Sequence, residues 1–195
     1  MAASARLPQI AVIVGSNRRD SINRKLAHAL AKLGAGKFEA KFVRIDDLPM
    51  FNQDLEANPP AQATRFKDEI ARADGVLIVT PEHNRSIPTV LKNAVDWGAR
   101  PYGKSAWPDK PGFITGTSGG AIGTALVQQH LRSVMTGLGM TLLGGEAYIT
   151  NKPNLIDEEG NIADESTKKF LQGFVDRFAT LVARLAPEAE RSAAA

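Results

Sequence analysis

The sequence of 195 residues contains no cysteine. Disulfide bonds, thiolate metal sites, iron–sulfur clusters and a cysteine nucleophile are therefore excluded, and a reducing compartment is compatible with this absence. Aromatic residues are also few, at 6%, and no apolar run approaches the roughly 20 residues that cross a bilayer. Residues 1–8 lack the apolar stretch of a signal peptide. We therefore expect a cytoplasmic protein with no membrane segment.

The chain has little excess charge of either sign. Its 24 Lys and Arg residues against 21 Asp and Glu residues give a net charge of +3. This excess is too small for a dedicated nucleic-acid binder, although it favours a slight attraction for small anions. The length and the 43% hydrophobic content are typical of one globular domain. We expect a single domain over 1–195, with 1–8 and 187–195 as flexible ends.

Short apolar runs alternate with amphipathic segments along the chain. The pattern predicts strands at 10–14, 38–45, 76–79, 113–115 and 141–148, and helices at 22–33, 63–73, 87–98, 124–138 and 165–185. Strands that are each followed by a helix need crossover connections, so we expect a doubly wound α/β fold with a parallel sheet. Ser86 is the expected N-cap of the third helix. Ligands of such sheets bind at the carboxyl ends of the strands, which directs attention to the loops there.

The loop after the first strand reads GSNRRDSIN over 15–23, which is neither a dinucleotide-binding nor a P-loop motif. It offers the hydroxyls of Ser16 and Ser21, the amide of Asn23 and the free N–H groups of a helix start. Arg18 can add a bidentate charge-assisted hydrogen bond. This set suits a phosphate dianion. The alternative is an ordinary helix start in which Ser21 is the N-cap and the arginines are solvated.

Two more loops carry groups that can face a ligand. In TPEHNRSIP, over 80–88, Pro81 stiffens the chain and leaves the amides of Glu82, His83 and Asn84 for a planar ligand with ring acceptors. His83 can lie against the face of that ligand, or it can be an exposed histidine in a helix-entry loop. The segment 115–123 holds four glycines, which allow close approach to a ligand or serve tight helix–sheet packing. Three such loops at adjacent strand ends favour one shared ligand.

The motifs GSNRRDSIN, TPEHNRSIPTVLKNAVDW and GTSGGAIG resemble the three FMN-binding segments of the NADPH-dependent FMN reductase-like family, specifically its bacterial soluble quinone/chromate reductases. The resemblance runs from residue 10 to 178. It implies a flavodoxin-like five-stranded sheet in the order 2-1-3-4-5 with FMN held tightly. By the resemblance, the residues that contact FMN are Ser16, Arg18, Ser21, Ile22 and Asn23 at the phosphate, Pro81, Glu82, His83 and Asn84 at the isoalloxazine, and Thr117, Ser118, Gly119 and Gly120 at the pyrimidine and ribityl side.

The resemblance also implies an oxidoreductase in which flavin N5 carries the chemistry, with no catalytic side chain and no metal. NADPH or NADH delivers a hydride and leaves, and a quinone or chromate then takes its place in a ping-pong cycle. Arg100 is expected to hold an anionic acceptor or a cofactor phosphate, or else it is a solvated loop arginine. Two alternatives are a flavodoxin-like electron carrier, which the basic charge disfavours, and a supplier of reduced FMN to a monooxygenase.

One residue departs from the family pattern, because His83 stands where the family usually has tyrosine. A protonated imidazole would place positive charge beside the flavin. The reduction potential is therefore predicted to rise with falling pH more steeply than proton coupling alone requires, and His83→Tyr should remove the extra slope.

The surface helices suggest an oligomer. The helix at 87–98 has a second apolar face with Val90 and Trp97, which favours a homodimer unless Trp97 completes the core. On the helix at 124–138, we expect polar residues to face water or a further interface. These residues are Gln128, Gln129, His130 and Arg132. The family resemblance suggests a homotetramer.

Overall fold

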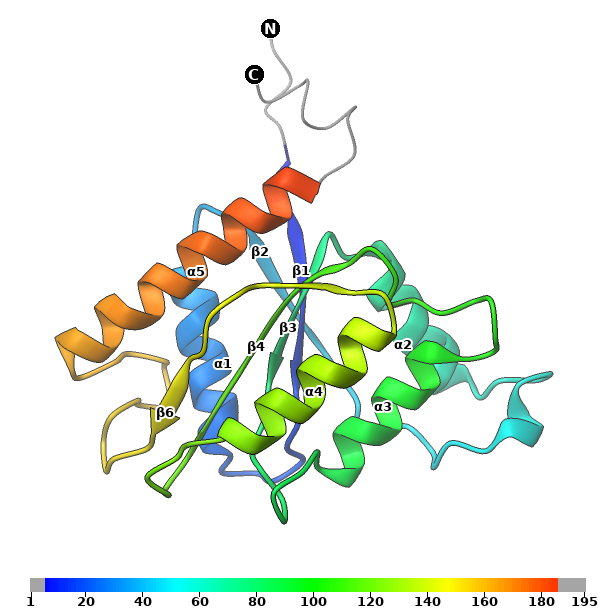
Figure 1. Ribbon diagram of the computed structural model, residues 1–195, viewed down its shortest axis with the longest axis horizontal. Helices are drawn as coiled ribbons and strands as arrows, with labels where there is room; N and C mark the ends of the chain where they lie inside the picture. The colour runs from blue at the N-terminus through cyan, green and yellow to red at the C-terminus, as the bar shows by residue number, and fades with distance from the viewer. Residues whose placement is uncertain (1–5, 186–195) are drawn as a thin grey trace, which may run out of the picture.

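The computed structural model describes residues 6–185, so most of the expected flexible ends lies outside the described residues. A twisted parallel sheet is covered by helices on both faces (Figure 1). Its strands follow the order β2-β1-β3-β4-β5, and β6 also pairs with β4. The doubly wound α/β fold and its strand order are therefore confirmed.

The elements are short strands and longer helices in alternation. The strands are β1 (Gln9–Val14), β2 (Glu39–Val43), β3 (Gly75–Val79), β4 (Pro111–Ser118), β5 (Thr141–Leu142) and β6 (Tyr148–Thr150). The helices are α1 (Ile22–Leu33), α2 (Ala61–Arg72), α3 (Thr89–Ala99), α4 (Ala125–Gly137) and α5 (Glu165–Leu185), with a single 3₁₀ turn at Gln53–Leu55. Apart from the fifth strand, the expected boundaries differ from these by at most three residues.

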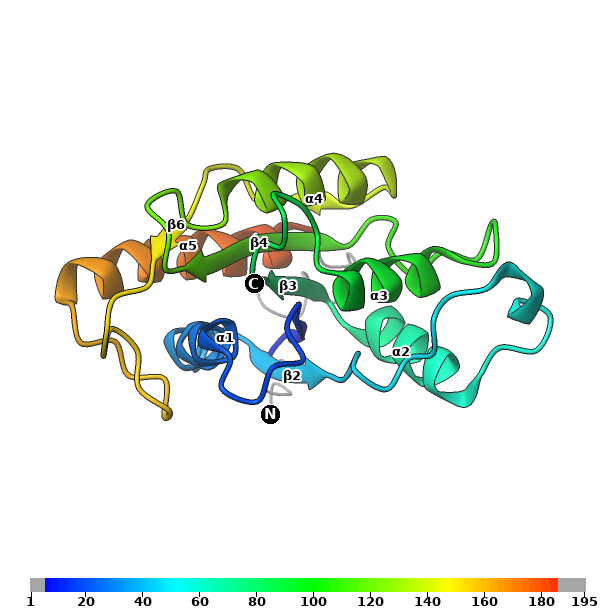
Figure 2. The ribbon, with the colours of Figure 1, turned by 90° about the horizontal axis from the view of Figure 1, so that it is seen from below.

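Two hydrophobic cores lie on the two faces of the sheet. Alternation along β1 sends Ile10 and Val12 to the face covered by α1 and α5, and Ala11 and Ile13 to the face covered by α2, α3 and α4. Figure 2 shows these helices on opposite sides of the sheet. Because the central strands are buried on both faces, they read as continuous apolar runs in the sequence.

The strand expected at 141–148 is interrupted, which corrects the prediction. β5 leaves β4 after two residues, and the chain returns to β4 only at β6. Between them, the carbonyls of Leu143 and Gly145 accept hydrogen bonds from the Arg132 guanidinium, at 2.9 and 2.6 Å. Arg132 of α4 thus forms hydrogen bonds with two carbonyls of the segment in which the strand is interrupted.

One residue of α4 also departs from expectation. Gln128, expected to face water or an interface, is fully buried. Its Nε2 donates to the carbonyl of Ala147 at 3.0 Å and to Thr124 Oγ1 at 2.9 Å. The prediction failed because a glutamine on a helix is usually a surface residue, and its buried partner, the Ala147 carbonyl just before β6, is not evident from the sequence.

Two predictions for α3 are corrected. The helix begins at Thr89 after Pro88, and Ser86 is not its N-cap. Trp97 is only 2% exposed, and its Nε1 donates to the carbonyl of Pro49 at 2.8 Å. The Trp97 ring also packs edge-on against Phe51, with 5.1 Å between centroids. The long loop after β2 therefore covers Trp97 within the chain, so Trp97 gives no support to a dimer interface.

Candidate functional site

The three loops singled out in the sequence lie next to one another. β1, β3 and β4 are adjacent and parallel, with Val14 opposite Val79 and Val79 opposite Thr115. β1 and β3 therefore end at one level, at the lower edge of the sheet in Figure 1, and β4 continues past Thr115 to Ser118. The structure brings together the predicted residues of 16–23, 81–84 and 117–120 at this carboxyl edge, as the rule for open α/β sheets requires.

Thr80 is the point where the three strand ends pack most closely. It is fully buried, and its N–H donates to the carbonyl of Thr115 at 3.0 Å. A Cβ atom on Gly15 would lie 2.4 Å from Thr80 Oγ1, and one on Gly116 would lie 2.0 Å from the Thr80 carbonyl oxygen. These two glycines are therefore required by packing.

Gly119 and Gly120 have a different environment. A Cβ atom on Gly119 would meet nothing within 4 Å, and one on Gly120 would meet only Ser118 Oγ, at 3.6 Å. Both residues are exposed. Packing within the chain does not require glycine here, so the open space beside these two residues can admit a ligand close to the backbone. The packing interpretation of the glycine-rich segment therefore applies to Gly116, and the ligand interpretation of Gly119 and Gly120 stays a prediction.

A single side chain joins the first loop to the third. Asn23, 1% exposed, donates from Nδ2 to the carbonyl of Thr117 and accepts at Oδ1 from the Thr117 N–H, both at 2.9 Å. The two residues are 94 positions apart in the sequence. Because one Nδ2 proton is used here, the other is what Asn23 can offer to an anion. The predicted phosphate residue is also the residue that fixes the two loops relative to each other.

The start of α1 carries donors suited to a phosphate. Ser21 is the N-cap, and its Oγ accepts from the Arg24 N–H at 3.3 Å, which leaves the hydroxyl proton free to donate. The first turn of α1 contains no acidic residue. Within residues 6–185, the exposed Arg18 guanidinium has no hydrogen-bond or ion-pair partner. These groups fit a phosphate dianion at a helix N-terminus.

The segment after β3 forms a small hairpin. The N–H of His83 donates to the carbonyl of Ser86 at 3.1 Å, and the reverse bond measures 2.9 Å. Asn84 and Arg85 at its tip have φ values of 48° and 63°, as in a type I′ turn. The His83 amide is therefore engaged and does not point at a ligand, contrary to expectation. The imidazole of His83 is exposed, and its predicted place beside a flavin stays a prediction.

The carboxylate of Glu82 has a function that the sequence did not reveal. Its Oε2 accepts from the N–H groups of Leu126 and Val127, at 3.0 and 3.1 Å, and so caps α4. Its Oε1 accepts from Arg85 at 3.2 Å, and the side chain is only 7% exposed. No local signal marks this contact, because the capping residue lies more than 40 positions before the helix that it caps.

Two further contacts fix the loops of the carboxyl edge. Helix α4 contacts the hairpin at a second point, and β6 contacts the glycine-rich loop. Ser86 Oγ lies 2.9 Å from His130 Nδ1. Thr150 Oγ1 donates to the carbonyls of Gly120 and Ala121, at 3.4 and 3.3 Å. Side chains therefore fix the backbone of the loops, which pre-forms the edge that a ligand would meet.

Arg100 does not join this group within one chain. It follows the far end of α3, whose 11 residues span about 16 Å, whereas the 81–84 loop precedes the other end. There its Nε donates to Glu56 Oε1 at 2.6 Å beside a cavity of about 340 Å³. In the same loop Trp107 is fully buried and Tyr102 is 91% exposed. None of these side chains forms a wall of the carboxyl edge in the same chain.

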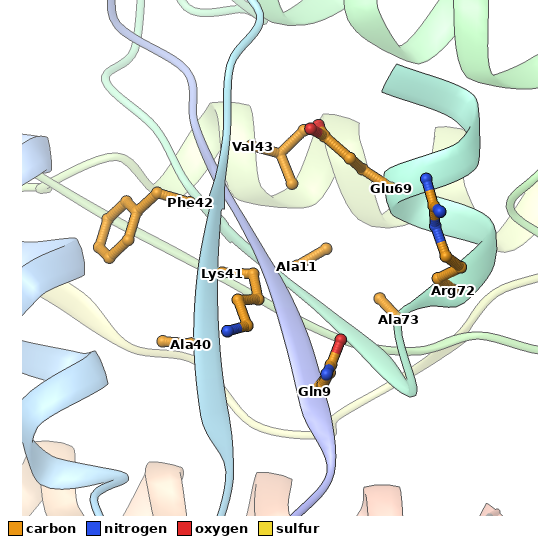
Figure 3. A pocket seen from close by; sticks show the side chains of 9 residues that line it. All are labelled: Gln9, Ala11, Ala40, Lys41, Phe42, Val43, Glu69, Arg72 and Ala73. Carbon is orange, nitrogen blue, oxygen red and sulfur yellow. The ribbon is translucent and has the colours of Figure 1, made fainter. Parts of the chain in front are cut away.

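Another cavity, of about 390 Å³, lies between β2 and the end of α2 (Figure 3). Lys41, Glu69 and Arg72 line it, and it contains none of the predicted site residues. Across residues 6–185 there is no group of three or more His, Asp or Glu residues that could hold a metal ion. The same residues form no helix that is long and apolar enough to span a membrane.

The family model of NADPH-dependent FMN reductase matches residues 8–154. Among curated proteins, a 2-hydroxy-1,4-benzoquinone reductase of a Burkholderia species is 54% identical over 175 residues, with 89% of this chain and 96% of the relative covered. A quinone reductase of Pseudomonas putida is 48% identical, with coverages of 89% and 94%.

Solved structures also match the chain. FerB, a flavoenzyme NAD(P)H:(acceptor) oxidoreductase from Paracoccus denitrificans, superposes with a TM-score of 0.88 at 44% identity, covering 91% of this chain and 98% of that one. A flavodoxin, WrbA-like protein from Agrobacterium tumefaciens superposes with a TM-score of 0.60 at 16% identity, over 92% of this chain and 99% of that one, and shows likeness of fold alone. The matched segment contains all three loops of the carboxyl edge, and the chain belongs to the NADPH-dependent FMN reductase family.

Proposed function

We propose that this protein is an FMN-dependent NAD(P)H:acceptor oxidoreductase that reduces quinones. The observation that carries the proposal is the carboxyl edge itself, where a phosphate-type donor set and the open backbone of Gly119 and Gly120 lie on adjacent loops. Relatives named quinone reductase, at 54% and 48% identity, support the acceptor class. Chromate fits the same open edge as a permissive substrate.

Residues of all three loops contribute to the binding of FMN. Ser16, Arg18 and Ser21 hold the phosphate, with Ile22 and Asn23 at the first turn of α1. The segments 81–84 and 117–120 flank the ring and the ribityl chain. When bound, FMN supplies the redox chemistry, because its ring accepts a hydride and passes two electrons on. The protein fixes the loop backbone beforehand through Asn23 and Glu82, which reduces the ordering cost of binding.

We propose a ping-pong order, with the nicotinamide donor and the acceptor using the same open face in turn. The exposed imidazole of His83 and the exposed glycines 119 and 120 border this face. A cytoplasmic location, where NAD(P)H is available, is part of the proposal.

The assignment of Arg100 to an anionic acceptor requires more than one chain. Its own carboxyl edge lies at the opposite end of α3, so Arg100 can serve this face only in a second copy. The proposed role of Arg100 therefore requires the proposed homodimer or homotetramer. A monomeric mass in light scattering at micromolar concentration would exclude both.

The test combines a binding measurement with turnover. Purified protein should stay yellow after gel filtration and should reduce benzoquinones with NADPH or NADH. Arg18→Ala should raise the Kd for FMN by about 10- to 100-fold, as expected for the loss of a charge-assisted hydrogen bond. Arg19→Ala is the matched control, since it removes the same charge from the neighbouring exposed residue and should leave the Kd within about twofold.

The alternatives have distinct outcomes in the same experiment. A colourless protein that consumes NAD(P)H only with added free FMN would indicate a supplier of reduced flavin. A yellow protein that is inert to NAD(P)H would indicate an electron carrier. Equal FMN affinity in Arg18→Ala and wild type would remove Arg18 from the phosphate site.

A further inference from the structure

A groove that none of the predicted site residues lines runs between β6 and the start of α5. Two cavities of about 340 and 380 Å³ adjoin there and share Thr150, Lys152 and Thr167. The first extends over 152–155 and Asp164, and the second extends toward Tyr148 and Phe170. The shared lining places the two cavities side by side, and together they are called the groove.

The groove begins next to the open glycines of the carboxyl edge. β6 pairs with the end of β4, with Thr150 opposite Ser118. The Thr150 hydroxyl donates to the carbonyls of Gly120 and Ala121, so the wall of the groove is also the support of the glycine-rich loop. Thr150 therefore contacts the glycine-rich loop and lines the groove, so the groove lies close to the open face.

The lining of the groove has nucleotide-binding chemistry. Phe170 is 46% exposed, and its ring is held edge-on against Phe174 with 5.1 Å between centroids. Such an aromatic surface can stack with a base, because every base presents a π-face. The exposed Lys152 has no hydrogen-bond or ion-pair contact within 6–185, which leaves its ammonium for a phosphate.

One carboxylate lines the groove, and it accepts hydrogen bonds at the start of α5. Asp164 accepts from the Thr167 N–H at 2.7 Å and from Ser166 Oγ at 2.6 Å, so it caps α5. These hydrogen bonds, with a smaller contribution from the positive charge of Lys152, lower the pKa of Asp164 to about 2. The carboxylate therefore belongs to the helix cap, and Lys152 remains the groove's cation for a ligand.

We propose that this groove binds the adenylate half of the nicotinamide donor. The base stacks on Phe170 and a phosphate contacts Lys152, while the nicotinamide end lies over the open face by Gly119 and Gly120. The assignment rests on the proposed function, since it presumes that NADH or NADPH is the reductant. It gives a function to the partly exposed ring of Phe170 and to the Lys152 ammonium, which line the same cavity.

The kinetic test compares whole and truncated donors on the FMN-loaded enzyme. Lys152→Gln and Phe170→Leu should each raise the KM for NADH and for NADPH by about tenfold, with kcat within about twofold. The KM for reduced nicotinamide mononucleotide, which lacks the adenylate, should not change. Lys169→Gln is the matched control, because it removes the same charge from an exposed lysine beside Phe170 that does not line either cavity.

A binding test separates this proposal from the proposed function. ADP titrated into the protein by calorimetry should bind wild type and Lys169→Gln, and should bind Lys152→Gln about tenfold more weakly. Unchanged KM values, or an equal rise for the truncated donor, would overturn the groove assignment and leave the reductase intact. A wild-type protein inert to NADH, NADPH and the mononucleotide would overturn the reductase, and failure of ADP to bind would overturn the groove.

Discussion

The two edges of the sheet use polar side chains in opposite ways. At the carboxyl edge, where the helices begin, side-chain oxygens of Ser21 and Glu82 accept from the first N–H groups of α1 and α4. At the amino edge, where the helices end, Lys110 donates to the carbonyls of Ala71 and Ala73, at 2.8 and 2.5 Å. Each edge is thus matched to the partial charge of the helix ends that face it.

The difference shows why the small net positive charge says little about where anions bind. At the amino edge the cations are used by the protein: Lys67 bonds the carbonyls of Arg100 and Lys104, and Arg100 pairs with Glu56. Burial lowers the pKa of both Lys67 and Lys110 there. At the carboxyl edge, Arg18 keeps its donors free alongside the N-terminus of α1. Within the described part of one chain, an arginine with free donors therefore lies at the carboxyl edge, where we propose that the phosphate of FMN binds.

The largest effect is expected from Asn23→Ala. It leaves the buried N–H and carbonyl of Thr117 without partners and separates the first loop from the third. The free energy of unfolding should fall by about 3 kcal/mol, as urea denaturation would measure, since each unpaired buried group costs about 1–3 kcal/mol. FMN affinity should fall in parallel. A stability loss below about 0.5 kcal/mol would show that water replaces the side chain and that Asn23 does not fix the two loops.

A smaller effect is expected from Lys110→Met at the amino edge. This change removes two hydrogen bonds to carbonyls at the end of α2, one of the exposed Ala71 and one of the buried Ala73, so the free energy of unfolding should fall by about 1 kcal/mol. FMN affinity, measured by titration of flavin fluorescence, should stay within about twofold of wild type. A change in FMN affinity as large as that of Asn23→Ala would contradict the separation of the two edges.

The smallest effect concerns acid stability at the amino edge. Burial raises the pKa of Asp74, but two hydrogen bonds to its carboxylate act in the opposite direction. The Arg6 guanidinium donates at 2.8 Å and the Gln9 N–H at 2.7 Å. Their effect is larger, so the pKa of Asp74 lies below its usual value of 3.8. A lowered pKa in the folded state means stability that is present above about pH 3.8 and lost as pH falls through the folded value.

Asp74→Asn should therefore lower stability at pH 7 and make it less sensitive to pH below about 4, in urea titrations at a series of pH values. FMN affinity at pH 7 should not change. An acid dependence identical to that of wild type would show that the Asp74 contacts do not persist in solution.

Much of this architecture could be predicted from the sequence. The aliphatic runs at 10–14 and 76–79 are buried on both faces, which is why their periodicity identified central strands. Ser21 is the N-cap that its position before an amphipathic segment indicated. The doubly wound parallel sheet followed from strands that alternate with helices, and the strand order followed from the family resemblance. The rule for such sheets then gave the edge at which the three loops meet.

What the sequence could not show depends on partners that are distant in the chain. The carboxylate of Glu82 caps a helix more than 40 residues later, and Trp97 is covered by a loop more than 40 residues earlier. Gln128 is buried because a strand breaks away from its ladder, and helical periodicity carries no information on that break. Hydrophobic pattern locates elements, whereas these polar contacts are fixed only when the elements are packed together.

The bond pair between Asn23 and Thr117 also has a consequence for the order in which the chain folds. Its two residues are separated by 94 positions, so α1 can form early during synthesis but its loop is fixed only after β4 has joined the sheet. Closing so long a loop costs entropy that few early contacts repay. A ribosome-bound chain that stops before residue 117 therefore lacks the finished carboxyl edge, and uptake of flavin at the proposed site would report that the central sheet is complete.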